Sequence, residues 1–179
     1  MSALRGRLEA VDARATEALA GALHGLTARV QRIARAALGI WTHSGDSLVW
    51  LALGGAAWRF GSGLWAQLGE RIVLATVVAA GLTTILKFLI RRPRPVGAGP
   101  GAYFNKLDAH AFPSGHAMRA GALISAVGSL LPWWGALGLL LWAVSVALSR
   151  VILGLHHAGD VVAGLLVGAA AGAGLALLG

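Results

Sequence analysis

Apolar and polar positions divide the chain into two parts. In residues 1–38, leucines, valines and isoleucines recur at three- and four-residue steps, with arginines and acidic residues between them. That spacing is the period of an α-helix. The segment is too charged to cross a bilayer, and it lacks the compact apolar stretch and cleavage site of a signal peptide. We therefore expect residues 1–40 to form an amphipathic helix on the membrane surface. The alternative is a helix that packs only against protein.

From about residue 41 the pattern changes to long apolar segments. Each approaches the roughly 20 residues that a helix needs to cross a hydrocarbon core about 30 Å thick. Asp46 or Ser47 would cap the first of these helices. The predicted spans cover residues 46–65, 71–90, 113–132, 133–153 and 158–178. The sequence thus predicts an all-α integral membrane bundle of about five transmembrane helices over residues 41–179, preceded by the surface helix.

Composition supports a membrane protein. Of the 179 residues, 57% are hydrophobic and only 12% are charged, against about 25% charged in a typical soluble domain. Many of the 26 glycines lie inside apolar runs, as in membrane helices that pack closely on small residues. The chain has no cysteine, which excludes disulfides and thiolate metal sites.

The net charge of +8 indicates an anionic partner. Nucleic-acid binding is disfavoured, because the cations fall at the ends of apolar segments and in one loop, without a basic and aromatic platform. Anionic lipid headgroups are the better match.

Residues that can carry chemistry fall into three blocks. The first runs from Lys87 to Arg94, at the end of a predicted span and the start of a polar loop over residues 91–112. The second is Pro113-Ser114-Gly115-His116, and the third is Ser149-Arg150, five residues, His156, three residues and Asp160. Counting membrane crossings places all three blocks on one face. Three cations, two histidines and a carboxylate favour phosphoryl transfer, because cations bind a multiply charged group and histidines supply a nucleophile and a proton donor.

These blocks resemble the motifs of the type 2 phosphatidic acid phosphatase family, which also includes the vanadium haloperoxidases. Lys-x6-Arg-Pro, Pro-Ser-Gly-His and Ser-Arg-x5-His-x3-Asp occur here in that order. Any one block is weak evidence, but three in register are strong evidence. The resemblance implies a membrane lipid phosphatase that acts on phosphatidic acid, phosphatidylglycerol phosphate, a polyprenyl phosphate or diphosphate, or lipid A.

Each block residue has an expected role. His156 is the nucleophile that forms a phosphohistidine, and Asp160 orients its ring. His157 also has a helical spacing to Asp160, but the register of the third block selects His156. His116 is the general acid, at a helix start whose backbone N–H groups attract anions. The groups expected to bind the phosphate are Lys87, Arg94, Ser114, Gly115 and Arg150. No metal or cofactor is expected.

Two other functions use the same residues. A lipid-phosphate binding or transport protein would need the cations but not His116, His156 and Asp160. A haloperoxidase would hold vanadate in the same pocket.

The distribution of positive charge predicts which side of the membrane the blocks face. Six arginines in residues 1–40, together with Arg91, Arg92 and Lys106, lie on the face of the blocks. The positive-inside rule predicts that this face of a cell inner (plasma) membrane protein is cytoplasmic, although many bacterial enzymes that this chain resembles work on the outer face.

Overall fold

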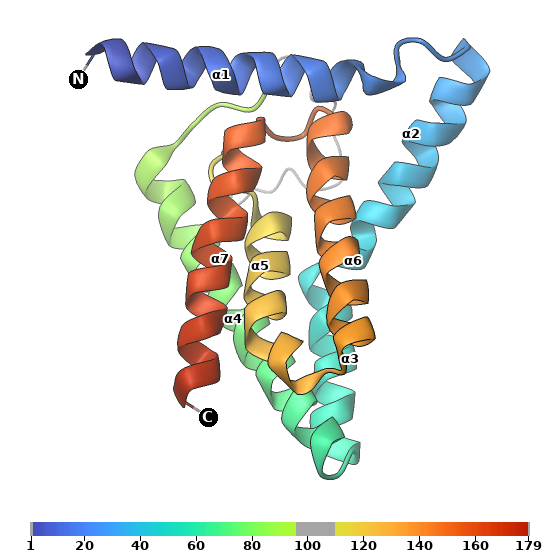
Figure 1. Ribbon diagram of the computed structural model, residues 1–179, viewed down its shortest axis with the longest axis vertical. Helices are drawn as coiled ribbons and strands as arrows, with labels where there is room; N and C mark the ends of the chain where they lie inside the picture. The colour runs from blue at the N-terminus through green and yellow to red at the C-terminus, as the bar shows by residue number, and fades with distance from the viewer. Residues whose placement is uncertain (1, 96–109, 179) are drawn as a thin grey trace.

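The computed structural model describes residues 2–95 and 110–178, and every regular element in them is a helix (Figure 1). The predicted all-α membrane bundle is confirmed. The α-helices are α1 (Ser2–Ala20), α2 (Ala28–Thr42), α3 (Ser47–Phe60), α4 (Leu64–Ile90), α5 (Gly115–Val127), α6 (Trp133–Ile152) and α7 (Ala158–Leu178). Residues 96–109, which form most of the predicted polar loop, lie outside the described residues.

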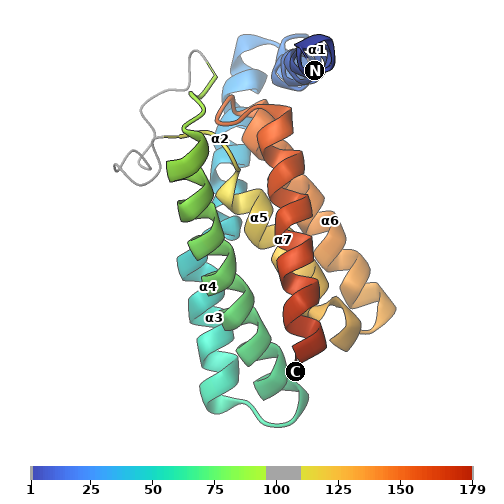
Figure 2. The ribbon, with the colours of Figure 1, turned by 90° about the vertical axis from the view of Figure 1, so that its left-hand side faces the viewer.

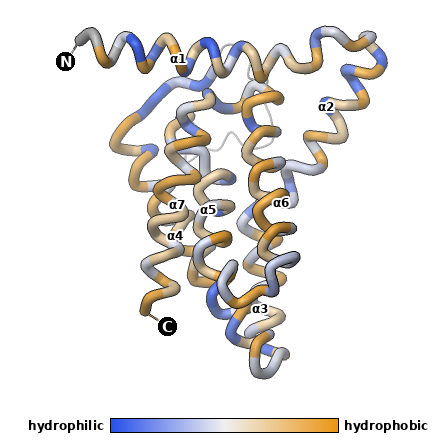
Figure 3. Tube along the Cα trace, in the orientation of Figure 1, coloured by the Kyte–Doolittle hydropathy of each residue, from blue (hydrophilic) through white to orange (hydrophobic). Residues whose placement is uncertain are grey.

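Among the residues that the structure describes, three helices are long and apolar enough to cross a bilayer: α4, α6 and α7. Figure 3 shows the apolar residues running along them, and polar residues gathered on α1 and α2 and after α4. By contrast, α3 has 14 residues and α5 has 13, or about 20 Å each at 1.5 Å per residue. By length alone, the structure supports three of the five predicted spans.

Helix α5 is an enclosed helix. It packs against α4, α6 and α7. Its first turn lies deeper in the bundle than the end of α6 and the start of α7 (Figure 1). The predicted span over 113–132 is too long, because the chain leaves the α-helix at Gly128 and forms a 3-10 turn, Gly128–Leu130. The block that starts α5 is therefore recessed into the protein.

The predicted boundary between the first two spans is wrong. Helix α3 ends at Phe60 and α4 begins at Leu64, well before Arg71. The turn contains Gly63, whose φ of 53° is in the left-handed region that glycine adopts without steric cost. Arg71 lies inside α4, where its Nη1 donates to the carbonyl of Ala126 at 3.2 Å, near the end of α5.

The expected single helix over residues 1–40 is two helices. A 3-10 turn, Gly21–Leu23, and residues 24–27 separate them. Helix α1 lies across one end of the bundle, whereas α2 descends along α6 toward α3 (Figures 1 and 2). Periodicity alone does not reveal this break, because the apolar spacing continues through the turn.

Glycines of α5 and α7 let these two helices approach closely. A Cβ on Gly168 would lie 1.9 Å from the carbonyl oxygen of Met118, and one on Gly172 would lie 2.2 Å from that of Ala122. A Cβ on Gly121 of the facing helix would lie 2.2 Å from the carbonyl oxygen of Leu165. Small residues at such positions are the usual basis of tight helix packing in membranes. The contact fixes the start of α5 against the start of α7.

Gly168→Ala is expected to lower the free energy of unfolding by about 1–3 kcal/mol, because the added methyl group forces the helices apart. Gly174→Ala on the same helix is the matched control, since nothing lies within 4 Å of its Cβ position. Thermal unfolding in detergent measures both. Equal melting temperatures for the two variants would contradict this account of the α5–α7 contact.

Candidate active site

The three sequence blocks meet at the end of the bundle that α1 covers. The end of α4 brings Lys87, which is 3% exposed and whose Nζ donates to the carbonyl of His110 at 2.6 Å. Arg94 follows in the segment after α4, and its Nη1 donates to the carbonyl of Leu155 at 2.9 Å. These bonds join the first block to the segment just before the second block and to the third block itself.

The Pro-Ser-Gly-His block starts α5. The backbone N–H of Ser114 donates to the carbonyl of Asp160 at 3.0 Å, which joins the second block to the third. The Ser114 hydroxyl is buried and has no hydrogen-bond partner among the described residues. Next to it, the first N–H groups of α5 have no partner within the helix, as at every helix start. A buried donor beside a helix N-terminus suits an anion.

His116 has a carboxylate partner. Its Nε2 lies 2.8 Å from Oδ1 of Asp46, and Oδ2 of the same carboxylate lies 2.9 Å from Nδ1 of His43. Asp46 is at the predicted cap position of α3, but its side chain makes no capping hydrogen bond. Its carboxylate contacts the two histidine rings instead of capping the helix.

The break between α2 and α3 is held in place by Arg119. This buried side chain donates to the carbonyl of Gly45 and to the hydroxyl of Ser47. The sequence predicts only a helix cap at Asp46, because an acidic residue before an apolar run gives the same signal whether it caps the helix or bonds a histidine.

The third block turns back at the end of α6. Arg150 is 1% exposed, and its Nη1 donates to the hydroxyl of Thr42 at 3.1 Å. The N–H groups of Leu155 and His156 both donate to the carbonyl of Arg150, at 3.0 and 3.2 Å. Gly154 has a φ of 71°, so a glycine is suited to this turn. The turn carries His156 into the interior.

His156 faces Asp160 through Nδ1, at 3.8 Å from Oδ2. That distance is longer than a hydrogen bond, and such contacts often shorten when substrate binds. Asp160 is 0% exposed, and its Oδ2 also accepts from the N–H of His157 at 2.9 Å. With Nδ1 toward the carboxylate, Nε2 is the ring nitrogen left for chemistry.

Burial lowers the pKa of His156 to about 4, and the positive charges of Arg150, Arg94 and Lys87 act in the same direction against the opposing effect of Asp160. The imidazole is therefore neutral at pH 7 and keeps a lone pair for attack. The three cations lie close enough to influence this one ring. The structure therefore brings these three cations close to His156.

Arg92, which the sequence places on this face without a role in the site, contacts two carboxylates. Its Nη1 donates to Oδ1 of Asp160 at 2.8 Å, and its Nη2 donates to Oδ2 of Asp12 in α1 at 2.6 Å. Burial lowers the pKa of the guanidinium, but the bond to Asp12 and the charges of Asp160 and Asp12 outweigh it and raise the pKa above the usual value.

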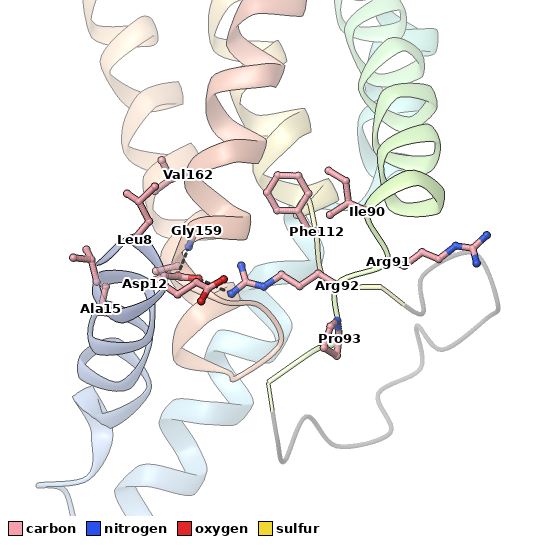
Figure 4. A pocket seen from close by; sticks show the side chains of 13 residues that line it. Leu8, Asp12, Ala15, Ile90, Arg91, Arg92, Pro93, Phe112, Gly159 and Val162 are labelled. Atoms are coloured by element: carbon pink, nitrogen blue, oxygen red, sulfur yellow. Dashed lines mark hydrogen bonds and ion pairs between the residues drawn. The ribbon is translucent and has the colours of Figure 1, made fainter. Parts of the chain in front are cut away.

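A pocket of about 810 Å³ lies beside this pair, between α1 and the ends of α4 and α7 (Figure 4). Its walls are mainly apolar, and Arg92 and Asp12 form a polar edge. The lining includes Leu8, Val11, Ala15, Ile90, Phe112 and Val162.

Within residues 2–95 and 110–178, no group of three or more His, Asp or Glu side chains could hold a metal ion. The expectation that no metal is needed stays a prediction.

Fold and site together define a helical membrane protein with a buried, cationic, two-histidine site at its helix ends. Residues 70–178 match the family model of the PAP2 superfamily. The chain belongs to the PAP2 superfamily.

Named relatives agree with this assignment. The chain is 37% identical over 101 residues to a lipid A 1-phosphatase of Rhizobium johnstonii, a match that covers 52% of this chain and 41% of the relative. It is 35% identical over 99 residues to a decaprenylphosphoryl-5-phosphoribose phosphatase of Mycobacterium tuberculosis, covering 54% and 52%. The chain thus spans about half the length of the curated relatives it matches.

Two crystal structures share the fold. LpxE from Aquifex aeolicus superposes with a TM-score of 0.68 at 21% identity, over 88% of this chain and 89% of that one. The first transmembrane PAP2 type phosphatidylglycerolphosphate phosphatase from Bacillus subtilis gives 0.70 at 24% identity, over 96% and 84%.

A titration tests the electrostatics of the site. We expect His156 to remain neutral down to a pH of about 4, because burial and three cations oppose its protonation. NMR of protein labelled at histidine gives the midpoint, and His156→Gln identifies the resonance by its loss. A midpoint near the ordinary value of 6.5 would contradict the described surroundings of the ring.

Proposed function

We propose that this protein is a lipid phosphatase that removes a terminal phosphate from a membrane lipid through a phosphohistidine at His156. The observation that carries the proposal is the pair of histidines, each beside its own carboxylate, among buried cations. His156 faces Asp160 and His116 faces Asp46. A protein that only binds lipid phosphate needs the cations but gains nothing from this pairing.

The reaction proceeds in two displacements. Nε2 of His156 attacks phosphorus, the bond from phosphorus to the ester oxygen breaks, and His116 gives that oxygen its proton. His116 then takes a proton from water, the water oxygen attacks the phosphohistidine, and inorganic phosphate leaves with His156 restored. Asp160 stabilises the positive ring in the intermediate, and Asp46 holds His116 in place between the two steps.

Lys87, Arg94 and Arg150 neutralise the nonbridging oxygens as negative charge develops, with the Ser114 hydroxyl as a further donor. Preorganised donors of this kind are each worth on the order of 10²–10³ in rate. These groups and the histidine supply the charge neutralisation and the nucleophile without a metal ion, so EDTA is expected to leave activity intact.

A lipid substrate is supported by three observations. The bundle has helices long and apolar enough to span a membrane, the apolar pocket borders the site through Arg92, and the names of the relatives refer to lipid A and to a decaprenyl lipid. The relatives favour lipid A or a polyprenyl phosphate as substrate, and phosphatidic acid and phosphatidylglycerol phosphate remain in the same chemical class.

We further propose that the site faces the cytoplasm from the cell inner membrane, following the positive-inside rule. Helix α1 packs against α6 and α7 at the site end, so a label on α1 reports the membrane side of both α1 and the site. Ala10→Cys introduces a single thiol at an exposed position of a chain without cysteine. A membrane-impermeant maleimide is expected to label it only after the cells are opened. Rapid labelling in sealed cells would reverse the orientation.

Phosphate release from a panel of these lipids by the detergent-purified protein tests the proposed function. His156→Ala is expected to lose at least about 10³-fold in kcat, because it removes the nucleophile. His157→Ala, at the next position, is the matched control and should retain turnover. Activity with none of the lipids, or turnover by His156→Ala comparable with that of His157→Ala, would overturn the proposal. Loss of activity in EDTA with recovery in Mg²⁺ would overturn the metal-free mechanism.

A further inference from the structure

Arg92 links helix α1 to the carboxylate that orients the nucleophile. Its guanidinium bridges Asp12 and Asp160, at 2.6 and 2.8 Å. The side chain of Asp160 is 0% exposed, that of Asp12 is 15% exposed and that of Arg92 is 32% exposed. Charge pairs this shielded from water interact more strongly than surface pairs. The two bonds therefore constrain where Arg92 lies.

The bond from Arg92 also constrains Asp160. Arg92 occupies Oδ1, while Oδ2 accepts from the N–H of His157 and faces Nδ1 of His156. Two donors on the two oxygens fix the rotation of the carboxylate group. If Arg92 moved away, the carboxylate would lose one of these donors, and its orientation toward His156 would be less well defined.

Arg92 needs an anchor of its own, because it lies in the non-helical segment after α4. Asp12 is that anchor, as Figure 4 shows, with Arg92 reaching toward Asp12 on α1. Asp12 is itself held at the start of α7: its Oδ1 accepts from the N–H of Gly159 at 2.7 Å. The next turn of α1 repeats the contact, since the hydroxyl of Thr16 accepts from the N–H of Ala158 at 2.9 Å.

We propose that Asp12 and Arg92 are positioning residues for the nucleophile, so that α1 helps to set the geometry of His156 and Asp160. Neither residue needs to touch the phosphate for this role. The inference rests on the proposed phosphatase function. It adds to that function a requirement for the N-terminal helix, which none of the three sequence blocks contains.

The alternative is that α1 contributes only to stability, through its contacts with the start of α7. The chain offers variants that separate the two roles. Asp12→Asn keeps an oxygen for the Gly159 N–H but removes the charge that holds Arg92. Thr16→Val removes the contact with Ala158 and the bonds that the hydroxyl donates to the carbonyl and Oδ1 of Asp12, at 2.7 and 3.5 Å, but it keeps the charge pair of Asp12 with Arg92. Glu17→Gln removes an acidic charge from an exposed position of the same helix.

Steady-state kinetics on the best lipid of the panel gives the first test. Asp12→Asn and Arg92→Gln should each lower kcat on the order of tenfold, the usual effect of losing a partner that orients a functional group, with KM unchanged. The double variant should be no slower than Arg92→Gln, because the two residues act as one unit. Thr16→Val and Glu17→Gln should keep the kcat of the unmodified protein, even where Thr16→Val lowers the melting temperature. Asp12→Glu should recover part of the rate.

Three kinetic outcomes would overturn the inference. In the first, Asp12→Asn retains the full kcat. In the second, Asp12→Asn and Thr16→Val lose kcat and melting temperature in parallel, which means that α1 acts through stability alone. In the third, Arg92→Gln raises KM without lowering kcat, which makes Arg92 a substrate-binding residue.

NMR of the His156 ring gives a second test that needs no substrate. Asp12→Asn and Arg92→Gln should shift its resonances, whereas Thr16→Val and Glu17→Gln should leave them in place. Unchanged resonances in Arg92→Gln would overturn the inference whether or not the protein is a phosphatase. Conversely, shifted resonances in a protein that hydrolyses none of the lipids would overturn the proposed function and leave the coupling between α1 and His156 standing.

Discussion

The site depends on the buried carboxylate of Asp160. A charged group without exposure to water is tolerated only where it is paired and hydrogen-bonded. The carboxylate obtains these partners from the first and third blocks, and the backbone of Asp160 bonds the second block. Arg92 pairs with Oδ1, the N–H of His157 bonds Oδ2, and the carbonyl of Asp160 accepts from Ser114. The hydrogen bonds of this one residue join the end of α4, the start of α5 and the start of α7.

Close packing of α5 and α7 supplies the second constraint. Because glycines allow the two backbones to approach, the start of α5 lies beside the start of α7, and His116 and His156 belong to one site. The short α5 is recessed in the bundle. A phosphate bound there, as we propose, would leave bulk water, and this would strengthen its interactions with Lys87, Arg94 and Arg150. The same desolvation keeps His156 neutral.

Much of this arrangement could be predicted from the sequence. The lengths of the apolar segments predict the membrane bundle, and a count of membrane crossings places Lys87, His116 and His156 on one face. The polar partners of the site could not be predicted in this way. Asp12 and Arg92 are 80 residues apart, and a charge in an N-terminal helix is most simply explained by solvent or lipid headgroups. Asp46 gave the same signal as a helix cap.

Some predicted helix boundaries were wrong for a related reason. Arg71 indicated a membrane edge, yet its charge is accommodated inside α4 by the carbonyl of Ala126. The turn after α1 preserves the apolar spacing on both sides. In each case a tertiary contact overrides a local pattern, and such contacts involve partners that are distant in the chain.

If phosphate is transferred through His156, it can be trapped on that residue during turnover. A lipid substrate with labelled phosphate, mixed with the protein and quenched in base within one turnover, is expected to leave an acid-labile, base-stable label. Peptide mass spectrometry should locate that label on His156. The label should persist in His157→Ala and disappear in His156→Ala. Label on any other residue, or single-turnover hydrolysis by His156→Ala at the rate of the unmodified protein, would contradict the account.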